Sequence, residues 1–180
     1  MAPSEPSSGV PPVSARDHVQ GSSTALVTLI EYADYECPDC GLAFAVVKAL
    51  QKRFGDKLRF VFRHFPLDEH FNAESAAQAA EAAGAQGKFW EMHDELFKNQ
   101  LELEPDNLAV YAKRLKLDVK RVESELERAV HRPRVRADVE TGARAGMNGT
   151  PAFFINGVRF DGEPTEAGLA AALNAAMPGN

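Results

Sequence analysis

The chain has 180 residues, enough for one ordinary domain with a sizeable core. With 26 acidic against 20 basic side chains its net charge is -6, which gives no electrostatic basis for binding nucleic acid or anionic lipid. No apolar run approaches the roughly 20 residues that span a bilayer, so we expect no membrane insertion. The N-terminus lacks the basic and apolar regions of a secretory signal. We therefore expect a cytoplasmic protein, or a periplasmic or exported one if the native chain carries a leader.

The first half of the chain predicts a flexible arm followed by a strand, a helix and a second strand. Residues 1–23 are rich in Pro, Ser and Gly without periodicity, which is typical of a flexible arm. The apolar run 25–33 indicates a strand covered on both faces. A helix is predicted to start at Cys37, because Pro38 suits the first helical position. The alternating segment 57–65 predicts the second strand, so the two strands should pair in parallel as a βαβ unit.

The second half predicts a block of helices and then a return to sheet. From 72 to 147 the apolar pattern is helical throughout. Residues 151–160 are apolar on both sides of Asn156 and Gly157, which is a strong signal for a β-hairpin. A last amphipathic helix is predicted to open near Thr165. The pattern indicates an all-helical block inserted between two halves of an α/β domain.

The chain has two cysteines, Cys37 and Cys40, at the start of the first predicted helix. A disulfide between them would close too short a loop to serve as a scaffold. A zinc site would need two more ligands, and none of His64, His70 or His93 is paired at ligand spacing, so we expect no metal. Redox chemistry is the remaining interpretation.

The position of the cysteines predicts different roles for them. A helix N-terminus favours thiolate over thiol, which lowers the pKa of Cys37. Cys40 lies one turn later on the same helix face, within disulfide reach. We expect an exposed attacking sulfur at Cys37 and a shielded resolving sulfur at Cys40. The alternative is a pair of inert core cysteines.

The motif Cys37-Pro38-Asp39-Cys40 after a strand, with Gly149-Thr150-Pro151 before a hairpin, resembles the DsbA-like branch of the thioredoxin superfamily. DsbA, FrnE-type and antiporter-fused thioredoxin domains belong to that branch. The resemblance extends from about residue 17 onward, and its supporting stretches are residues 63–67, 85–90 and 149–157. It implies an α/β, thioredoxin-like fold built from residues 24–67 and 148–178, with residues 68–147 as an inserted helical domain.

The resemblance also implies partners for the cysteines. It places a cis peptide bond at Thr150–Pro151, packed against the cysteines, where the backbone is free to bind an extended substrate. It places Glu31 as a buried acid beneath the active site. Since a carboxylate is costly in an apolar strand, we expect a raised pKa and a role in proton transfer with Cys40. The alternative is a glutamate at the exposed end of the strand.

Pro38 and Asp39 are the predicted tuning positions within the motif. Asp39 stands where the best-known oxidants of the family carry histidine. A negative charge there disfavours a nearby thiolate, so we expect a less oxidising couple and a higher Cys37 pKa than in those relatives. Tyr32 and Tyr35 are expected either to rim a substrate groove or to pack in the core.

The predicted function is that of a thiol–disulfide oxidoreductase acting on protein or peptide thiols and disulfides, with the direction of transfer left open. No cofactor is expected, because the sulfurs themselves carry the redox equivalents. We expect a monomer. The alternatives are a redox-sensing regulatory module and a chaperone-like module that binds partners through the cis-proline groove.

Overall fold

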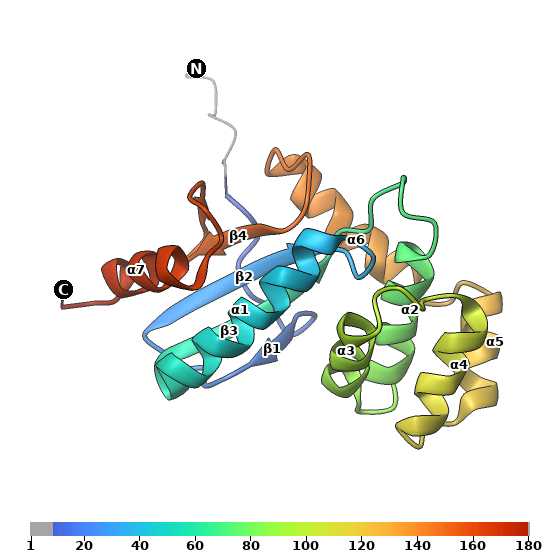
Figure 1. Ribbon diagram of the computed structural model, residues 1–180. Coiled ribbons are helices and arrows are strands. Elements are labelled where there is room, and N and C mark those ends of the chain that lie inside the picture. The colour runs from blue at the N-terminus through green and yellow to red at the C-terminus, as the bar shows by residue number, and fades with distance from the viewer. Residues whose placement is uncertain (1–8, 180) are drawn as a thin grey trace.

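The computed structural model describes residues 9–179 (Figure 1). Within that range the strands form a five-stranded sheet in the order β1-β3-β2-β4-β5. The elements in chain order are β1 (His18–Gln20), β2 (Val27–Ala33), α1 (Pro38–Phe54), the 3-10 turn η1 (Gly55–Lys57), β3 (Leu58–His64), α2 (Ala73–Gly84), α3 (Phe89–Lys98), α4 (Pro105–Arg114), α5 (Val119–Glu127), α6 (Arg132–Arg144), β4 (Ala152–Ile155), β5 (Val158–Phe160) and α7 (Glu166–Ala176).

The centre of the sheet is the predicted βαβ unit. Strands β2 and β3 pair in parallel and α1 connects them. Strand β4 pairs antiparallel with the other side of β2 and continues into β5 through a hairpin. Asn156 and Gly157 form the turn with positive φ angles of 48° and 83°, which are the backbone angles that make Asn-Gly a hairpin signal.

Helices cover both faces of the sheet, which explains the continuous apolar pattern of β2. Figure 1 shows α1 and α7 on one face and α6 on the other. Leu29 of β2 belongs to the core on the α1 side, whereas Ile30 and Tyr32 belong to a second core that includes Val139 of α6. Alternate residues of the strand therefore enter different cores, and all of them need to be apolar or specifically paired.

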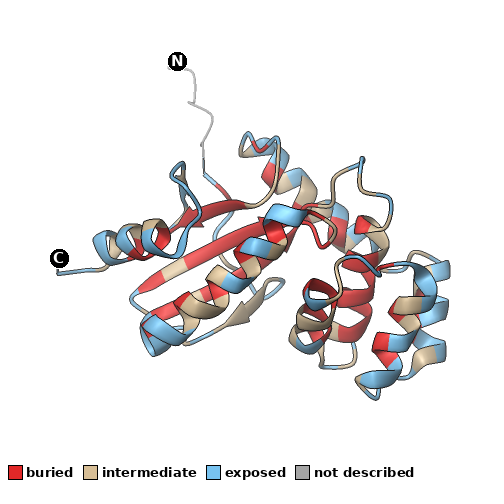
Figure 2. Cartoon of the chain, viewed as in Figure 1, coloured by how far each residue is buried: buried red, intermediate tan, exposed pale blue. Residues whose placement is uncertain are grey.

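The helical insertion consists of α2 to α6, between β3 and β4. Helix α4 begins at Pro105, and the side chain of Asp118 caps α5 by accepting a hydrogen bond from the Arg121 backbone at 3.1 Å. The alanine-rich α2 is almost entirely buried, while α4 and α5 present exposed faces (Figure 2). No helix within residues 9–179 is long and apolar enough to cross a membrane.

The predicted flexible arm is wrong for the part of it that the structure describes, and residues 1–8 lie outside that part. Strand β1 pairs antiparallel with β3, adding an edge to the sheet. The guanidinium of Arg63 in β3 donates to Asp17 at 2.7 and 3.1 Å and to the Pro11 carbonyl at 3.0 Å. Val10 is buried against the second core. This segment is held by a buried ion pair and one short strand, neither of which produces a periodic sequence pattern.

Candidate functional site

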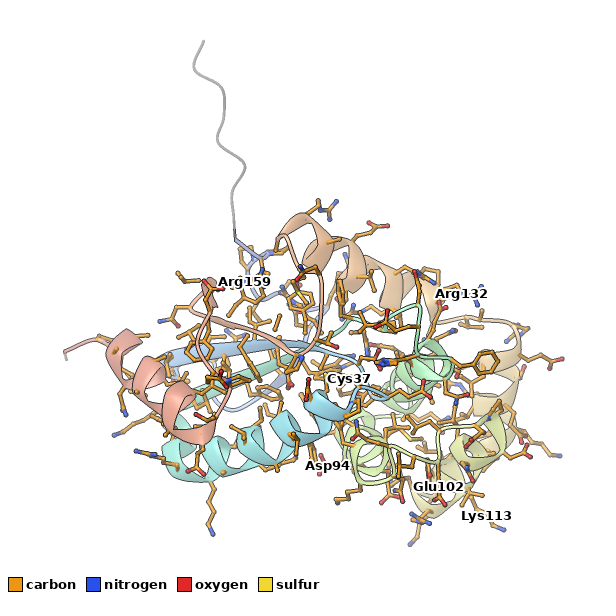
Figure 3. The ribbon with its side chains drawn as sticks, turned by 45° about the horizontal axis from the view of Figure 1, so that its top comes forward. Cys37, Asp94, Glu102, Lys113, Arg132 and Arg159 are labelled. Carbon is orange, nitrogen blue, oxygen red and sulfur yellow. The ribbon has the colours of Figure 1, made fainter. Side chains whose placement is uncertain are left out.

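Cys37 lies where α1 begins, at the boundary between the sheet and the helical insertion (Figure 3), and Cys40 follows in the first turn of the helix. Cys37 is the extended residue just before the helix, with φ -73° and ψ 122°, and Pro38 follows as the first helical residue. The Cys37 carbonyl accepts from the Gly41 N–H at 3.2 Å and begins the helical hydrogen-bond pattern. The predicted start of the helix is therefore confirmed, and the backbone N–H groups of Asp39 and Cys40 in its first turn interact with the first sulfur.

The two sulfurs differ in environment and in acidity. Cys37 is 6% exposed and Cys40 is fully buried, so the attacking sulfur is less accessible than we expected. A hydrogen bond with Cys40 lowers the pKa of Cys37 to about 6, and hydrogen bonds with Thr150 and the Asp39 N–H act in the same direction against burial. Burial raises the pKa of Cys40 far above its usual value. One sulfur therefore favours the thiolate and the other the thiol.

Glu31 lies beneath the cysteines, on the side of β2 that faces α1. It is 1% exposed, between Phe62 of β3 and Phe153 of β4 in the sheet register. Its Oε1 has no hydrogen-bond partner among residues 9–179. Burial raises the pKa of Glu31 from 4.5 to about 8, and its charge in turn raises the pKa of Cys40. The alternative of an exposed glutamate is thus excluded, and the predicted raised pKa agrees with this position.

The loop before β4 completes the site from the opposite side. The Thr150–Pro151 peptide bond is cis, as the sequence resemblance implies. The thiol of Cys37 donates to the Thr150 carbonyl at 3.5 Å, so the loop and the first sulfur are in contact. The Thr150 hydroxyl is buried without a hydrogen-bond partner among the described residues. Segments more than 110 positions apart along the chain therefore meet at this site.

A family model described as "Thioredoxin" matches residues 14–175. The chain belongs to this thioredoxin family. Among curated proteins it is 46% identical over 165 residues to a Na(+)/H(+) antiporter, NhaA 1, of Salinispora arenicola and 39% identical over 170 residues to NhaA of Herminiimonas arsenicoxydans. It covers 25% and 27% of those relatives, with 91% and 94% of its own length. The chain thus spans about a quarter of the curated relatives it matches.

Solved structures show the same thioredoxin-like fold with its helical insertion. BdbD from Bacillus subtilis superposes with a TM-score of 0.86 at 22% identity, over 95% of this chain and 97% of that one. A thioredoxin-like oxidoreductase from Silicibacter pomeroyi gives 0.78 at 28% identity, over 91% and 93%. Alpha-DsbA1 from Wolbachia pipientis gives 0.78 at 21%, over 92% of each chain. The predicted DsbA-like resemblance and fold class are confirmed.

The tyrosines beside this thioredoxin-family motif pack in the core. Tyr32 and Tyr35 are 0% and 1% exposed. The Tyr35 hydroxyl hydrogen-bonds with Nδ1 of His93 at 3.0 Å, among the rings of Phe62 and Phe97. Of the two interpretations of these tyrosines, the structure supports packing.

Asp39 and Pro38 are exposed on the first turn of α1. The backbone N–H of Asp39 is one of the groups that lower the pKa of Cys37. Its side chain is in water, where its charge is screened. The predicted effect of Asp39 on the redox couple is thus untested and should be smaller than that of a buried charge.

Two further contacts at the site could not be found from the sequence pattern. Gln100, in the connection after α3, donates from Nε2 to the carbonyls of Tyr35 and Cys37 at 2.9 and 2.8 Å. Asp34, between β2 and α1, is buried and accepts from Nδ1 of His70 at 2.7 Å. Both contacts hold the loop that carries the cysteines, and both join residues with no local spacing signal.

Three ligand-type side chains meet elsewhere, where β1, β3 and α2 adjoin. The Nε2 atoms of His18 and His64 lie 2.7 and 2.8 Å from Oε1 of Glu81, and the three atoms lie within 4.8 Å of one another. A metal-bound imidazole normally donates its second N–H to a partner, but the buried Nδ1 of His64 has none among the described residues. We interpret the trio as a hydrogen-bonded clamp, and the expected absence of a metal stays a prediction.

Proposed function

We propose that this chain is a thiol–disulfide oxidoreductase that exchanges disulfides with proteins or peptides through Cys37 and Cys40. The observation that supports this most directly is the asymmetry of the two sulfurs. One lies at the helix N-terminus with a pKa of about 6, and the other is fully buried with a raised pKa. Such a pair provides a nucleophile at neutral pH and a second thiol that stays protonated until it resolves the mixed disulfide.

In the reducing direction the Cys37 thiolate attacks one sulfur of a substrate disulfide. A mixed disulfide forms, and the other substrate sulfur leaves as a thiolate. Cys40 then gives its proton to the ionised form of Glu31, which a pKa of about 8 leaves as a minor fraction near neutral pH. The Cys40 thiolate attacks Cys37, which releases the second substrate thiolate and leaves a Cys37–Cys40 disulfide. The oxidising direction is the same sequence reversed, with Glu31 returning the proton.

The substrate is proposed to bind along the loop that contains Thr150 and Pro151. This loop contacts Cys37, and the resemblance to DsbA-like proteins implies that its backbone pairs with an extended substrate. A peptide bound there would place its sulfur next to Cys37. This arrangement favours protein or peptide substrates over small thiols.

Substituting the cysteines one at a time tests the function. Cys37→Ser should abolish reduction of insulin and refolding of a scrambled disulfide protein. Cys40→Ser should accumulate a mixed disulfide with the substrate, seen as a thiol-sensitive band on a non-reducing gel, because the resolving thiol is missing. Retention of full activity by a folded Cys37→Ser variant would contradict the proposal. Partner binding that neither cysteine substitution affects would favour a binding module that does not use the cysteines.

A second candidate is a redox-responsive regulatory module. It is favoured by the curated relatives, which are antiporters four times as long as the matching segment. Ion exchange could be measured in vesicles that hold such an antiporter, with this chain added in its oxidised or reduced form. Equal exchange in the two states would contradict regulation by the disulfide, without bearing on the disulfide exchange itself.

A further inference from the structure

The connection between β3 and α2 is attached to the loop that leads into the cysteines. Oδ2 of Asp34 accepts from the Leu67 N–H at 2.8 Å and from Nδ1 of His70 at 2.7 Å. The carboxylate of Glu36 accepts from the Asn72 N–H at 2.7 Å and from its amide at 3.3 Å. Two acids of the β2–α1 loop therefore hold the connection that carries His70.

The same Asp34 contacts both cysteines through its backbone. Its N–H donates to Sγ of Cys40 at 3.5 Å, and its carbonyl accepts from the Cys37 N–H at 3.2 Å. The Asp34 side chain is fully buried, so the direction in which it holds His70 is fixed by the fold. His70 itself is 22% exposed in its side chain and can exchange protons with solvent.

The charges around His70 favour its protonated form. Burial lowers the pKa of His70, but the hydrogen bond to Asp34 and the negative charges of Asp34, Cys37 and Glu36 outweigh burial and raise it. These charged groups all lie in the loop between β2 and α1, which ends at Cys37. Since Coulomb interaction is mutual, a Cys37 thiolate that stabilises the His70 cation is stabilised by it to the same extent.

We propose that His70, held by Asp34, is a positioning residue whose positive charge stabilises the Cys37 thiolate and thereby shifts the redox couple towards the reduced, dithiol form. The inference rests on the proposed disulfide exchange and names a group outside the linear motif that tunes it. The cation offsets the carboxylates of Glu36 and Asp39, which flank Cys37 in the sequence and oppose a thiolate.

If the charge of His70 acts on Cys37, the pKa of His70 depends on the redox state of the cysteines, whereas simple anchoring of the loop predicts no such dependence. Reduction creates a thiolate at Cys37 and oxidation removes it, so His70 should hold its proton more tightly in the reduced protein. The pKa of His70, followed by NMR of the imidazole protons, is therefore expected to fall on oxidation of Cys37 and Cys40. A histidine that only ties the loop to Asp34 would titrate alike in both states.

The substitution His70→Gln retains an N–H for Asp34 and removes the charge, whereas His70→Lys retains a positive charge. We expect His70→Gln to slow alkylation of Cys37 at pH 6 and to shift the equilibrium with glutathione about three- to tenfold towards the oxidised protein. His70→Lys should shift it less. The matched control is His131→Gln, whose imidazole pairs with Glu125 at 2.7 Å and is 17% exposed, and it should change neither measurement.

The outcomes separate this inference from the proposed function. A folded His70→Gln variant with unchanged alkylation and glutathione equilibrium would overturn it, as would a wild-type His70 titration that is the same in both redox states. If the variant fails to fold, the titration of the wild-type protein decides alone. If the wild-type protein exchanges no protein disulfides and yet its His70 titration responds to oxidation, the function fails and the inference stands.

Discussion

Two buried glutamates, one in the sheet and one in the helical insertion, have opposite surroundings. Glu31 in β2 is 1% exposed and its Oε1 has no hydrogen-bond partner among residues 9–179. Glu81 in α2 is 8% exposed and accepts from His18 and His64, with Nε of Arg134 at 4.0 Å. Burial raises the pKa of Glu31 to about 8. Burial acts in the same direction on Glu81, but the two histidines outweigh it and lower the pKa of its carboxyl.

The difference shows that hydrogen-bond donors, more than burial, decide whether a buried carboxyl is charged or neutral. A carboxylate with several donors stays charged and ties elements together, as Glu81 ties β1 and β3 to α2. A carboxyl with none has a raised pKa, here about 8, so it is mostly neutral near pH 7 with a minor ionised fraction that can take a proton from a neighbour, here Cys40. The fold thus places its clamp in the insertion and its proton carrier beneath the sulfurs.

The largest expected effect is the loss of the clamp. Glu81→Ala leaves the buried imidazole of His64 and the half-buried one of His18 without their acceptor and should lower the free energy of unfolding by about 3 kcal/mol. Urea unfolding followed by circular dichroism measures it. Glu123→Ala, an exposed glutamate on α5, is the matched control and should change stability by no more than about 0.5 kcal/mol. A Glu81→Ala variant as stable as the control would show that the trio does not hold the elements together.

Glu31→Gln should instead preserve the fold and alter its pH dependence. Because the folded pKa of about 8 lies above the ordinary 4.5, the neutral form favours the native state. That contribution is fully present below about pH 4.5 and is lost as the pH rises towards 8. The wild-type unfolding free energy should therefore decline across this window. The variant should lack this decline, because glutamine does not ionise.

Glu31→Gln should also slow the resolving step of disulfide exchange by about tenfold at pH 7, since Cys40 loses its proton acceptor. Single-turnover decay of the mixed disulfide measures that step. Glu81→Gln is the counterpart. The Glu81 carboxyl of the wild-type protein has a lowered pKa, so its stabilising effect is present above about pH 4.5 and lost on further acidification, and the variant should lack this loss. Identical pH profiles of stability for the two variants would contradict the opposite pKa shifts of Glu31 and Glu81.

The sequence predicted most of the fold because its signals are local. The apolar runs of β2 and β3, Pro38 and Pro105 at helix starts, and the Asn156-Gly157 turn each depend on neighbouring residues. The cysteine pair, Glu31 and the cis bond before Pro151 followed from one motif and its resemblance. In these places local preference and the final fold agree.

The features that could not be predicted are pairings between distant residues. Arg63 with Asp17, Asp34 with His70, and Glu81 with His18 are 46, 36 and 63 positions apart. Each joins a charged or titratable side chain to one from another element, and neither member carries a periodic signal. The N-terminal segment was mistaken for a flexible arm because such an ion pair, more than an apolar face, attaches it.

The smallest expected effect concerns a third acid, Asp39. Unlike Glu31 and Glu81 it is exposed, so water and salt screen its charge. Asp39→His replaces a negative charge beside Cys37 by a neutral or positive one. We expect the pKa of Cys37 to fall by about half a unit and the glutathione equilibrium to move about threefold towards the reduced protein. The couple would then be more oxidising. Thiolate absorbance against pH and redox titration measure the two shifts.

The control for Asp39→His is Asp106→His. Asp106 follows Pro105 at the start of α4, as Asp39 follows Pro38 at the start of α1, but it has no cysteine beside it. It reproduces the change of charge at a helix N-terminus and should leave both redox measurements unchanged. A wild-type potential as high as that of the strong oxidants of the family, or an Asp39→His variant with the wild-type potential, would mean that Asp39 does not weaken the thiolate. The tuning would then come from the groups already in contact with the sulfurs, the Thr150 loop and the helix N-terminus, with His70 as the charge that acts on Cys37 from the neighbouring connection.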